Sequence, residues 1–135
     1  MRLAVIGSRK YPDPDRVRAL VRGVPAGTLI VSGGAEGPDS WAVDAARERG
    51  LAYLVFPAKW AELGRSAGLI RNQDIVDQAD RLVAFWDLKS RGTKDTINKA
   101  LADGKVVTIV PPGQKITLDF NDGVADTTSG SGSTE

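Results

Sequence analysis

Two turns in this sequence have the composition of anion-binding sites. The stretch VSGGAEGPDS, residues 31–40, places three glycines after an apolar run and directly before a predicted helix. Glycine leaves backbone amides open to close approach, and the helix dipole is positive where the loop enters. The second turn, Ser90-Arg91-Gly92-Thr93, offers two hydroxyls, a glycine amide and another helix start. Each turn taken alone is explained equally well by a steric need for glycine, but together the two turns favour phosphate binding.

The residues that are absent exclude several kinds of chemistry. The 135 residues include no cysteine and no histidine, so disulfides, thiol nucleophiles and cysteine or histidine metal sites are excluded. Any catalysis would therefore use carboxylates, Lys, Arg, Tyr, hydroxyls or backbone amides. We expect no metal site and no required cofactor. The net charge of +1 gives no bulk electrostatic reason for a nucleic-acid or membrane partner.

The elements that must position these turns alternate along the chain. Short apolar runs with strand character alternate with amphipathic helical patterns, which predicts a three-layer, Rossmann-like, doubly wound and mostly parallel sheet of about five strands. We expect one domain over residues 1–120, with a short edge strand over 116–120. Residues 121–135 are mostly Gly, Ser, Thr and Asp, a composition typical of a disordered tail. The predicted strands cover residues 3–7, 28–31, 51–56, 82–86 and 106–110.

The helix patterns carry clear start and stop signals. Asp13 and Pro14 are predicted as N-cap and first residue of a helix whose core stripe runs from Val17 to Val24. A second helix begins after the glycine turn and closes at Gly50. A loop over residues 57–66 leads into a third helix over residues 67–79, and a fourth ends at Gly104. No signal-peptide or transmembrane pattern is evident, so a cytoplasmic location is expected.

Ligands of such sheets bind beyond the carboxyl ends of the strands, near a topological switch point. Four segments carry small or polar residues there: 7–9, 32–39, 67–72 and 87–93. The candidate ligand- or phosphate-binding residues are Gly7, Ser8, Arg9, Ser32, Gly33, Gly34, Gly37, Asp39, Arg71, Asn72, Ser90, Gly92 and Thr93.

Asn72 has an unusual position for a polar side chain. It shares a helix face with Ile75 and Val76, and a buried amide needs a partner. Gly68, one turn earlier on the same face, costs about 1 kcal/mol relative to alanine. Both features are explained if this helix end faces a ligand or the glycine loop. In the alternative, Asn72 caps a neighbouring loop and Arg71 pairs with Asp74.

The aromatic residues near these segments are ambiguous. Trp60, in the predicted loop, is a candidate for stacking on a base. Trp86 and Tyr11 are more typical of packing, because a tryptophan near a strand end usually covers the core.

Four motifs in order resemble the SLOG superfamily. They are VIGSR at 5–9, VSGGAEGPD at 31–39, AGLIRN at 67–72 and FWDLKSRGT at 85–93. This Rossmann-like superfamily includes the LOG proteins and part of DNA-processing protein A, and the sequence is most similar to its small stand-alone branch related to YpsA and YspA. The resemblance spans residues 1–110. It implies a cleft for a nucleotide or nucleotide-derived sugar phosphate, and a homo-oligomer.

The resemblance to the LOG proteins is incomplete in their catalytic signature. LOG proteins cleave nucleoside monophosphates at the N-glycosidic bond. Their signature is PGGxGTxxE, and Gly92 and Thr93 match its GT. Thr96 stands at the glutamate position, and the nearest carboxylate, Asp95, is displaced by about 100° around a helix. Glycoside cleavage needs a carboxylate, so Asp39 and Asp95 are the candidate catalytic residues.

Three functions stay open. The first is a nucleotide-binding sensor or regulatory module, in which Arg9 and Arg71 bind the phosphate and Asp39 or Asn72 binds the ribose or base. The second is a nucleoside 5′-monophosphate N-glycosidase. The third is single-stranded DNA binding, which ranks last because aromatic residues are only 6% of the chain and such binders combine stacking aromatics with a basic groove.

Overall fold

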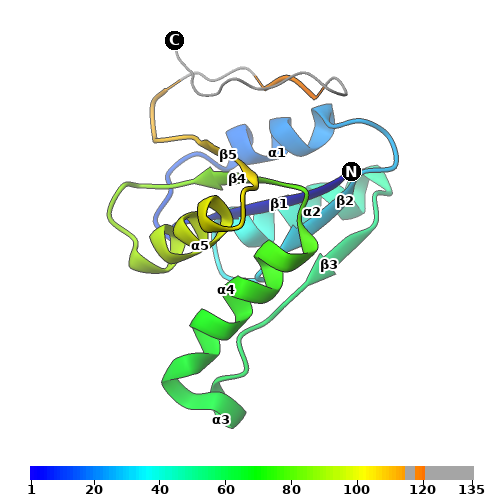
Figure 1. Ribbon diagram of the computed structural model, residues 1–135. Helices are drawn as coiled ribbons and strands as arrows, with labels where there is room; N and C mark the ends of the chain where they lie inside the picture. The colour runs from blue at the N-terminus through cyan, green and yellow to red at the C-terminus, as the bar shows by residue number, and fades with distance from the viewer. Residues whose placement is uncertain (115–117, 121–135) are drawn as a thin grey trace.

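Five parallel strands form one sheet in the computed structural model, which describes residues 1–114 and 118–120 (Figure 1). The strand order is β3-β2-β1-β4-β5, so the first strand lies at the centre. The predicted tail at 121–135 lies outside the described residues. The strands are β1 (Arg2–Gly7), β2 (Leu29–Ser32), β3 (Tyr53–Val55), β4 (Arg81–Phe85) and β5 (Val106–Ile109).

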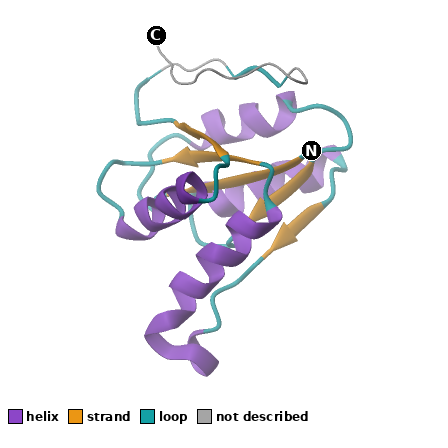
Figure 2. Cartoon of the chain, in the orientation of Figure 1, coloured by secondary structure: helices purple, strands orange, loops and turns teal. Residues whose placement is uncertain are grey.

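Helices cover both faces of the sheet (Figure 2). On one face, α1 (Pro14–Gly23) and α2 (Pro38–Arg49) pack on Leu3 and Val5 of β1. On the other, α4 (Ala67–Gln78) and α5 (Arg91–Ala102) pack on Ala4 and Ile6. Alternate residues of β1 therefore enter two separate cores, as a strand covered on both sides requires. The predicted three-layer, doubly wound fold is confirmed.

The helix signals in the sequence act as expected. Asp13 caps α1 by accepting a hydrogen bond from the amide of Arg16 at 3.2 Å, and Val17 and Val21 are fully buried. Gly50 closes α2 in the left-handed conformation, with φ of 81°. Since each of these helices buries one side against the sheet, packing rather than propensity holds the helices in place.

Three expectations about local structure were wrong. The predicted loop over 57–66 contains the one-turn helix α3 (Trp60–Leu63) and a 3₁₀ turn, η1 (Gly64–Ser66). The third strand is only three residues long, against the six predicted over 51–56. Of the predicted edge strand over 116–120, residues 116 and 117 lie outside the described residues, and 118–120 form no strand.

Residues 118–120 instead fold back over the core. Leu118 and Phe120 pack against the cluster under α1, and Arg81 donates a 2.7 Å hydrogen bond to the Asp119 carbonyl. The Arg81 guanidinium also lies 4.6 Å from the centre of the Phe120 ring. Apolar packing and a cation–π contact therefore fix this segment without ladder hydrogen bonds.

The end of β1 approaches its neighbours too closely for a side chain. A β-carbon at Gly7 would lie 2.4 Å from the carbonyl oxygen of Phe85 and 2.5 Å from Cγ of Pro38. Pro38 is the first residue of α2, so the absence of a side chain at Gly7 lets this helix begin directly over the strand end. Gly7 therefore sets the position of α2 and of the glycine turn before it.

We expect Gly7→Ala to destabilise the protein by about 1–3 kcal/mol, the usual cost of overpacking a core. The control is Gly23→Ala, because a β-carbon there meets no atom within 4 Å and alanine favours a helix by up to about 1 kcal/mol. Urea unfolding of both variants measures the difference. Equal stability of the Gly7 variant and the parent would contradict the close packing described here.

Candidate ligand-binding site at the carboxyl edge of the sheet

The switch point of the sheet lies between β1 and β4. From β1 the chain adds β2 and β3 on one side, then crosses to add β4 and β5 on the other. The turns that follow β1 and β4 are joined by Ser8, which is almost fully buried. Its hydroxyl donates to Oδ1 of Asp87 and accepts from the Asp87 amide, both at 3.0 Å. The turns after β1 and β4 are thus fixed relative to each other.

Asp87 organises the turn that leads into α5. Its Oδ1 also accepts the amides of Lys89 and Ser90 at 2.8 Å each. Burial alone would raise the pKa of Asp87, but the hydrogen bonds from Lys89, Ser90 and Ser8 outweigh it and lower the pKa. We did not include Asp87 among the candidate residues. The signal was present, since an aspartate three residues before a serine N-cap is typical of a side-chain-capped turn.

Asp39 occupies the position where the sequence predicted a phosphate. Its Oδ2 accepts the Gly33 amide at 2.8 Å and its Oδ1 accepts the Gly7 amide at 3.1 Å. The Gly34 amide is bound by the Ser32 hydroxyl at 3.2 Å. The expectation that this loop leaves bare amides was therefore wrong for Gly33 and Gly34, because the protein supplies its own acceptors.

Burial makes Asp39 an unusual carboxylate. Its side chain is enclosed, and this burial raises the pKa to about 6. The amides of Gly33 and Gly7, the Ser32 hydroxyl and the positive charge of Arg71 oppose that rise. With both oxygens bound to backbone amides, Asp39 joins the ends of β1 and β2 and is poorly placed to contact a ribose.

The glycines of the first turn have steric roles. A β-carbon at Gly33 would lie 2.7 Å from Nη1 of Arg71 and 2.9 Å from Oδ2 of Asp39. Gly34 and Gly37 have φ of 72° and 89°, which favour glycine. Gly92 differs from all of them: a β-carbon there meets nothing within 4 Å, and its φ is not in the left-handed range. Neither packing nor backbone geometry in the described chain requires glycine at position 92.

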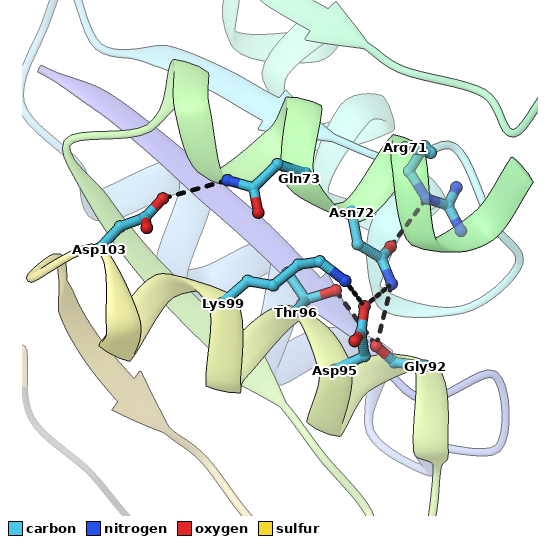
Figure 3. Close-up of polar contacts among 8 residues, drawn as sticks. All are labelled: Arg71, Asn72, Gln73, Gly92, Asp95, Thr96, Lys99 and Asp103. Atoms are coloured by element: carbon cyan, nitrogen blue, oxygen red, sulfur yellow. Dashed lines mark hydrogen bonds and ion pairs between the residues drawn. The ribbon is translucent and has the colours of Figure 1, made fainter. Parts of the chain in front are cut away.

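Polar side chains join α4 to α5 beside this edge (Figure 3). Asn72 donates to Oδ2 of Asp95 at 3.0 Å and to the Gly92 carbonyl at 3.4 Å, while Lys99 binds the same Asp95 oxygen at 2.5 Å. Arg71 donates to Oδ1 of Asn72 at 3.0 Å. Groups of α5 therefore satisfy the Asn72 amide, whereas the alternative had expected Asn72 to cap a neighbouring loop.

Arg71 contacts the glycine turn, as one of our two interpretations expected. Its Nη1 donates to the Gly33 carbonyl at 2.8 Å, so this arginine is directed to the glycine turn rather than to Asp74. Thr96, at the glutamate position of the LOG signature, is buried and donates to the Gly92 carbonyl at 3.1 Å. A threonine held in this way supplies no acid–base group to the edge.

The tryptophans have separate places. Trp60 is 57% exposed on α3, and its ring lies against Gly68, where a β-carbon would approach it to 3.2 Å. Gly68 therefore makes room for Trp60 rather than for a ligand. Trp86 donates from Nε1 to the Ser90 carbonyl at 3.0 Å and packs on the core. Tyr11 packs edge-to-face on Phe85, so both residues have the packing role expected of them.

Two helix starts meet at this edge with unsatisfied donors. Ser90 caps α5 by accepting the Thr93 amide at 3.4 Å. The two amides before it, those of Arg91 and Gly92, are not bound by this cap. Among residues 1–114 and 118–120, no group accepts a hydrogen bond from the amides of Asp39 and Ser40 in α2 or of Arg91 and Gly92 in α5. Gly37 lies against the carbonyl of Ser8, so the contacts run continuously from the α2 start through Ser8 and Asp87 to the α5 start.

Positive charge gathers around these helix starts. Five exposed cations belong to the turns after β1 and β4 and to the first turn of α5, and none of them forms an ion pair with a described residue. The edge can therefore attract an anion although the whole chain is nearly neutral. These cations are Arg9, Lys10, Lys89, Arg91 and Lys94.

Residues 1–114 and 118–120 contain neither a metal-binding cluster nor a membrane-spanning helix. No group of three or more acidic side chains is placed to hold a metal ion there. None of the helices in those ranges has the length and apolar character needed to cross a bilayer.

Comparison with solved structures identifies the fold. DNA processing protein A from Streptococcus pneumoniae superposes with a TM-score of 0.68 at 21% identity over 93% of this chain. The Helicobacter pylori protein of that name is described for its single-stranded DNA binding mode. It superposes with a TM-score of 0.67 at 22% sequence identity over 86% of this chain. The chain shares its fold with DNA processing protein A. The expected likeness to DNA processing protein A is thus confirmed at the level of the fold.

The similarity to DNA processing protein A covers part of that protein. This chain spans 53% of the S. pneumoniae structure and 66% of the H. pylori structure. TM1055, a structural genomics target, superposes with a TM-score of 0.60 at 22% identity. The match covers 78% of this chain and 71% of the TM1055 chain. No protein-family model and no curated protein matches the sequence.

The raised pKa of Asp39 predicts a pH-dependent contribution to stability. In the folded protein Asp39 keeps its proton up to about pH 6, whereas its ordinary pKa is 3.8. Its contribution is therefore fully present below pH 3.8 and is lost as the pH rises through 6. A shift of this size corresponds to about 3 kcal/mol.

Urea unfolding from acidic to neutral pH, compared between the parent and Asp39→Asn, measures this contribution. Asparagine presents an NH₂ donor to the amide of Gly7 or Gly33, so the variant will be less stable than the parent at every pH. The informative quantity is therefore the difference between the two proteins in how unfolding free energy changes with pH. Parallel stability curves, or a carboxyl NMR titration of Asp39 near 4, would contradict the assignment.

Proposed function

We propose that the protein binds a nucleotide or a nucleotide-derived sugar phosphate at the carboxyl edge of its sheet, acting as a sensor or regulatory module. The phosphate lies at the start of α5, and Arg9 faces it from the turn after β1. Gly92 is the observation that carries the proposal. A glycine in the first turn of a helix weakens that helix, and open space around it is explained by the close approach of an anion to its amide.

The neighbouring contacts support this placement. Ser8 and Asp87 hold the turn after β1 beside the α5 start, so Arg9 and the free amides of Arg91 and Gly92 belong to one rigid edge. Preorganised donors of this kind bind a phosphate without an ordering cost. We assign the Gly33 turn a supporting role, because Asp39 already accepts the Gly33 amide and the Ser32 hydroxyl accepts the Gly34 amide.

Binding is favoured over N-glycosidic cleavage. Asp95 is held by Asn72 and Lys99, and Asp39 by the amides of Gly7 and Gly33. A catalytic carboxylate must reach the reacting sugar, and both candidates are committed to other partners. No cofactor is required for the proposed role.

Single-stranded DNA is the second candidate ligand, favoured by one observation. The five cations named above, which form no ion pair with a described residue, come from two turns and a helix start, and an extended polyanion needs several such charges. The H. pylori protein of similar fold is described by its binding of single-stranded DNA. A strand would use the same α5 start and would bind much more weakly as salt is raised.

The first test is a thermal-shift screen of the 135-residue protein against AMP, other nucleoside monophosphates, ADP-ribose, NAD, cyclic nucleotides and oligo-dT. A nucleotide at 100 times its dissociation constant adds about 2.7 kcal/mol of stability, which raises the melting temperature by roughly 5–10 °C for a domain of this size. A response to oligo-dT alone, lost at high salt, would favour the second candidate. No response to any nucleotide would contradict the proposal.

Variants of the edge locate the ligand. For a hit from that screen, Arg9→Ala should raise the dissociation constant by about tenfold or more, the usual cost of a charge-assisted hydrogen bond. Gly92→Ala should also weaken binding while leaving the melting temperature unchanged or higher. Arg22→Ala, which removes the same charge from the last turn of α1, serves as the control. Unchanged affinity in both edge variants would place the ligand elsewhere. Arg71→Ala is less informative, because Arg71 also supports Gly33.

The enzymatic alternative is tested in the same samples. We expect no release of free base from any nucleoside monophosphate, because Thr96 replaces the signature glutamate and both candidate carboxylates are engaged. Chromatography of the supernatant after prolonged incubation detects the base. Release that Asp95→Asn abolishes would contradict this expectation and establish the N-glycosidase.

A further inference from the structure

Leu88, in the turn between β4 and α5, has an unusual backbone conformation for its residue type. Its φ is 69°, and among residues 1–114 and 118–120 every other residue with a positive φ is a glycine. The left-handed region brings a β-carbon close to the following carbonyl oxygen, so a leucine there is strained. Glycine and asparagine adopt this conformation at a lower cost. The turn therefore carries a leucine where its backbone favours another residue.

The Leu88 side chain gains little from packing. It is 57% exposed and belongs to neither of the two apolar cores. The turn around it is nevertheless fixed, because Asp87 accepts the amides of Lys89 and Ser90 at 2.8 Å each and Trp86 donates to the Ser90 carbonyl at 3.0 Å. A strained residue that the fold itself does not use indicates a contact with a molecule outside the chain.

Leu88 also lies beside the proposed phosphate position. It stands two residues before Ser90, the N-cap of α5, and the amides of Arg91 and Gly92 follow that cap. Figure 1 shows this turn beyond the end of β4 and next to the first turn of α5. A phosphate bound to those amides therefore places the rest of a small ligand near the Leu88 side chain.

We propose that Leu88 is the apolar contact for a nucleobase, so that the ligand is one that keeps its base rather than a base-free sugar phosphate. This inference rests on the proposed function and narrows it. Ligand sites combine a few polar anchors with apolar side chains, and bases in protein pockets lie against aromatic or apolar side chains. At the α5 start the amides and cations are the polar anchors, and Leu88 is an exposed apolar side chain in the turn before them.

The surroundings of Leu88 fit a base better than a protein partner. A stable protein interface buries about 800 Å² on each partner, whereas one leucine covers the face of a single ring. Lys89 and Arg91, close to it in the chain, are exposed and form no ion pair with a described residue. These cations attract the phosphate of the same ligand. Free nucleotides and nucleic-acid strands both carry such a base, and the test distinguishes the two sources.

The test compares four nucleoside 5′-monophosphates (AMP, GMP, CMP and UMP) with ribose 5-phosphate, which lacks the base, by isothermal titration calorimetry. We expect the parent to bind at least one of the four more tightly than ribose 5-phosphate. Leu88→Asn suits the left-handed backbone and removes the apolar surface. It should weaken the tightest nucleotide by about fivefold, as expected for a partly buried leucine, and leave ribose 5-phosphate unchanged. Leu88→Met keeps the apolar contact and should stay within about twofold of the parent.

Leu101→Asn is the matched control, because Leu101 is also 57% exposed but lies near the end of α5. It should leave nucleotide affinity unchanged. Without ligand, the two asparagine variants should differ in thermal stability. Leu88→Asn keeps or raises the melting temperature because strain is relieved, whereas Leu101→Asn lowers it because asparagine is a poorer helix former. A lower melting temperature for Leu88→Asn would overturn the strain on which the inference depends.

Oligo-dT, titrated at low and high salt, tests the second source of the base. A loss of affinity in Leu88→Asn for oligo-dT alone would assign the base to a strand. Nucleotide and oligo-dT affinities that Leu88→Asn leaves unchanged would overturn the inference, and so would an equal loss for nucleotide and ribose 5-phosphate. In both cases the phosphate site would stand. A parent protein that binds none of these ligands would contradict the proposed function, and this inference with it.

Discussion

One buried carboxylate holds the carboxyl edge of the sheet together. Asp39, in the first turn of α2, accepts the amide of Gly7 at the end of β1 and the amide of Gly33 after β2. Three elements distant in sequence thereby share one side chain. Arg71 continues the arrangement from the opposite face of the sheet by binding the Gly33 carbonyl. Without these contacts the glycine turn would have no fixed position relative to the centre of the sheet, and neither would the start of α2.

The same arrangement changes the electrostatics of the edge. A carboxylate in the first turn of α2 already interacts with the positive end of that helix dipole. A second anion would therefore be attracted less strongly to α2 than to α5, where the nearest carboxylate, Asp87, lies in the preceding turn and the first helical turn carries no acidic residue. The proposed ligand position follows from this asymmetry, and the glycine-rich turn after β2 has a structural role.

The fold could be predicted from the sequence because its signals are local. Apolar runs ending in glycine, the Asp13-Pro14 start and the αL glycine at position 50 each fix their elements without tertiary information. Short elements could not be predicted in this way. Trp60 to Leu63 form a single turn, too brief to show periodicity, and residues 118–120 are placed by contacts with Arg81 and the core rather than by a strand pattern.

The candidate site was predictable in location and only partly in detail. The four polar segments do converge at the carboxyl edge, as parallel strands require. The partner of each polar group, however, depends on distant residues. Asp39 binds an amide 32 residues away, and Asn72 binds groups 20 and 23 residues away. Spacing along the chain cannot distinguish such internal pairing from ligand binding.

The differing roles of the glycines affect how an alignment of related sequences should be interpreted. At Gly7, Gly34 and Gly37 a larger residue is disfavoured by crowding or by φ, so invariance there would report only that the fold is kept. Position 92 has no such constraint, and drift toward better helix formers is expected once a ligand no longer matters. Invariance at this single position would therefore be evolutionary evidence of selection for binding, and its loss in a branch of relatives would mark those that have abandoned it.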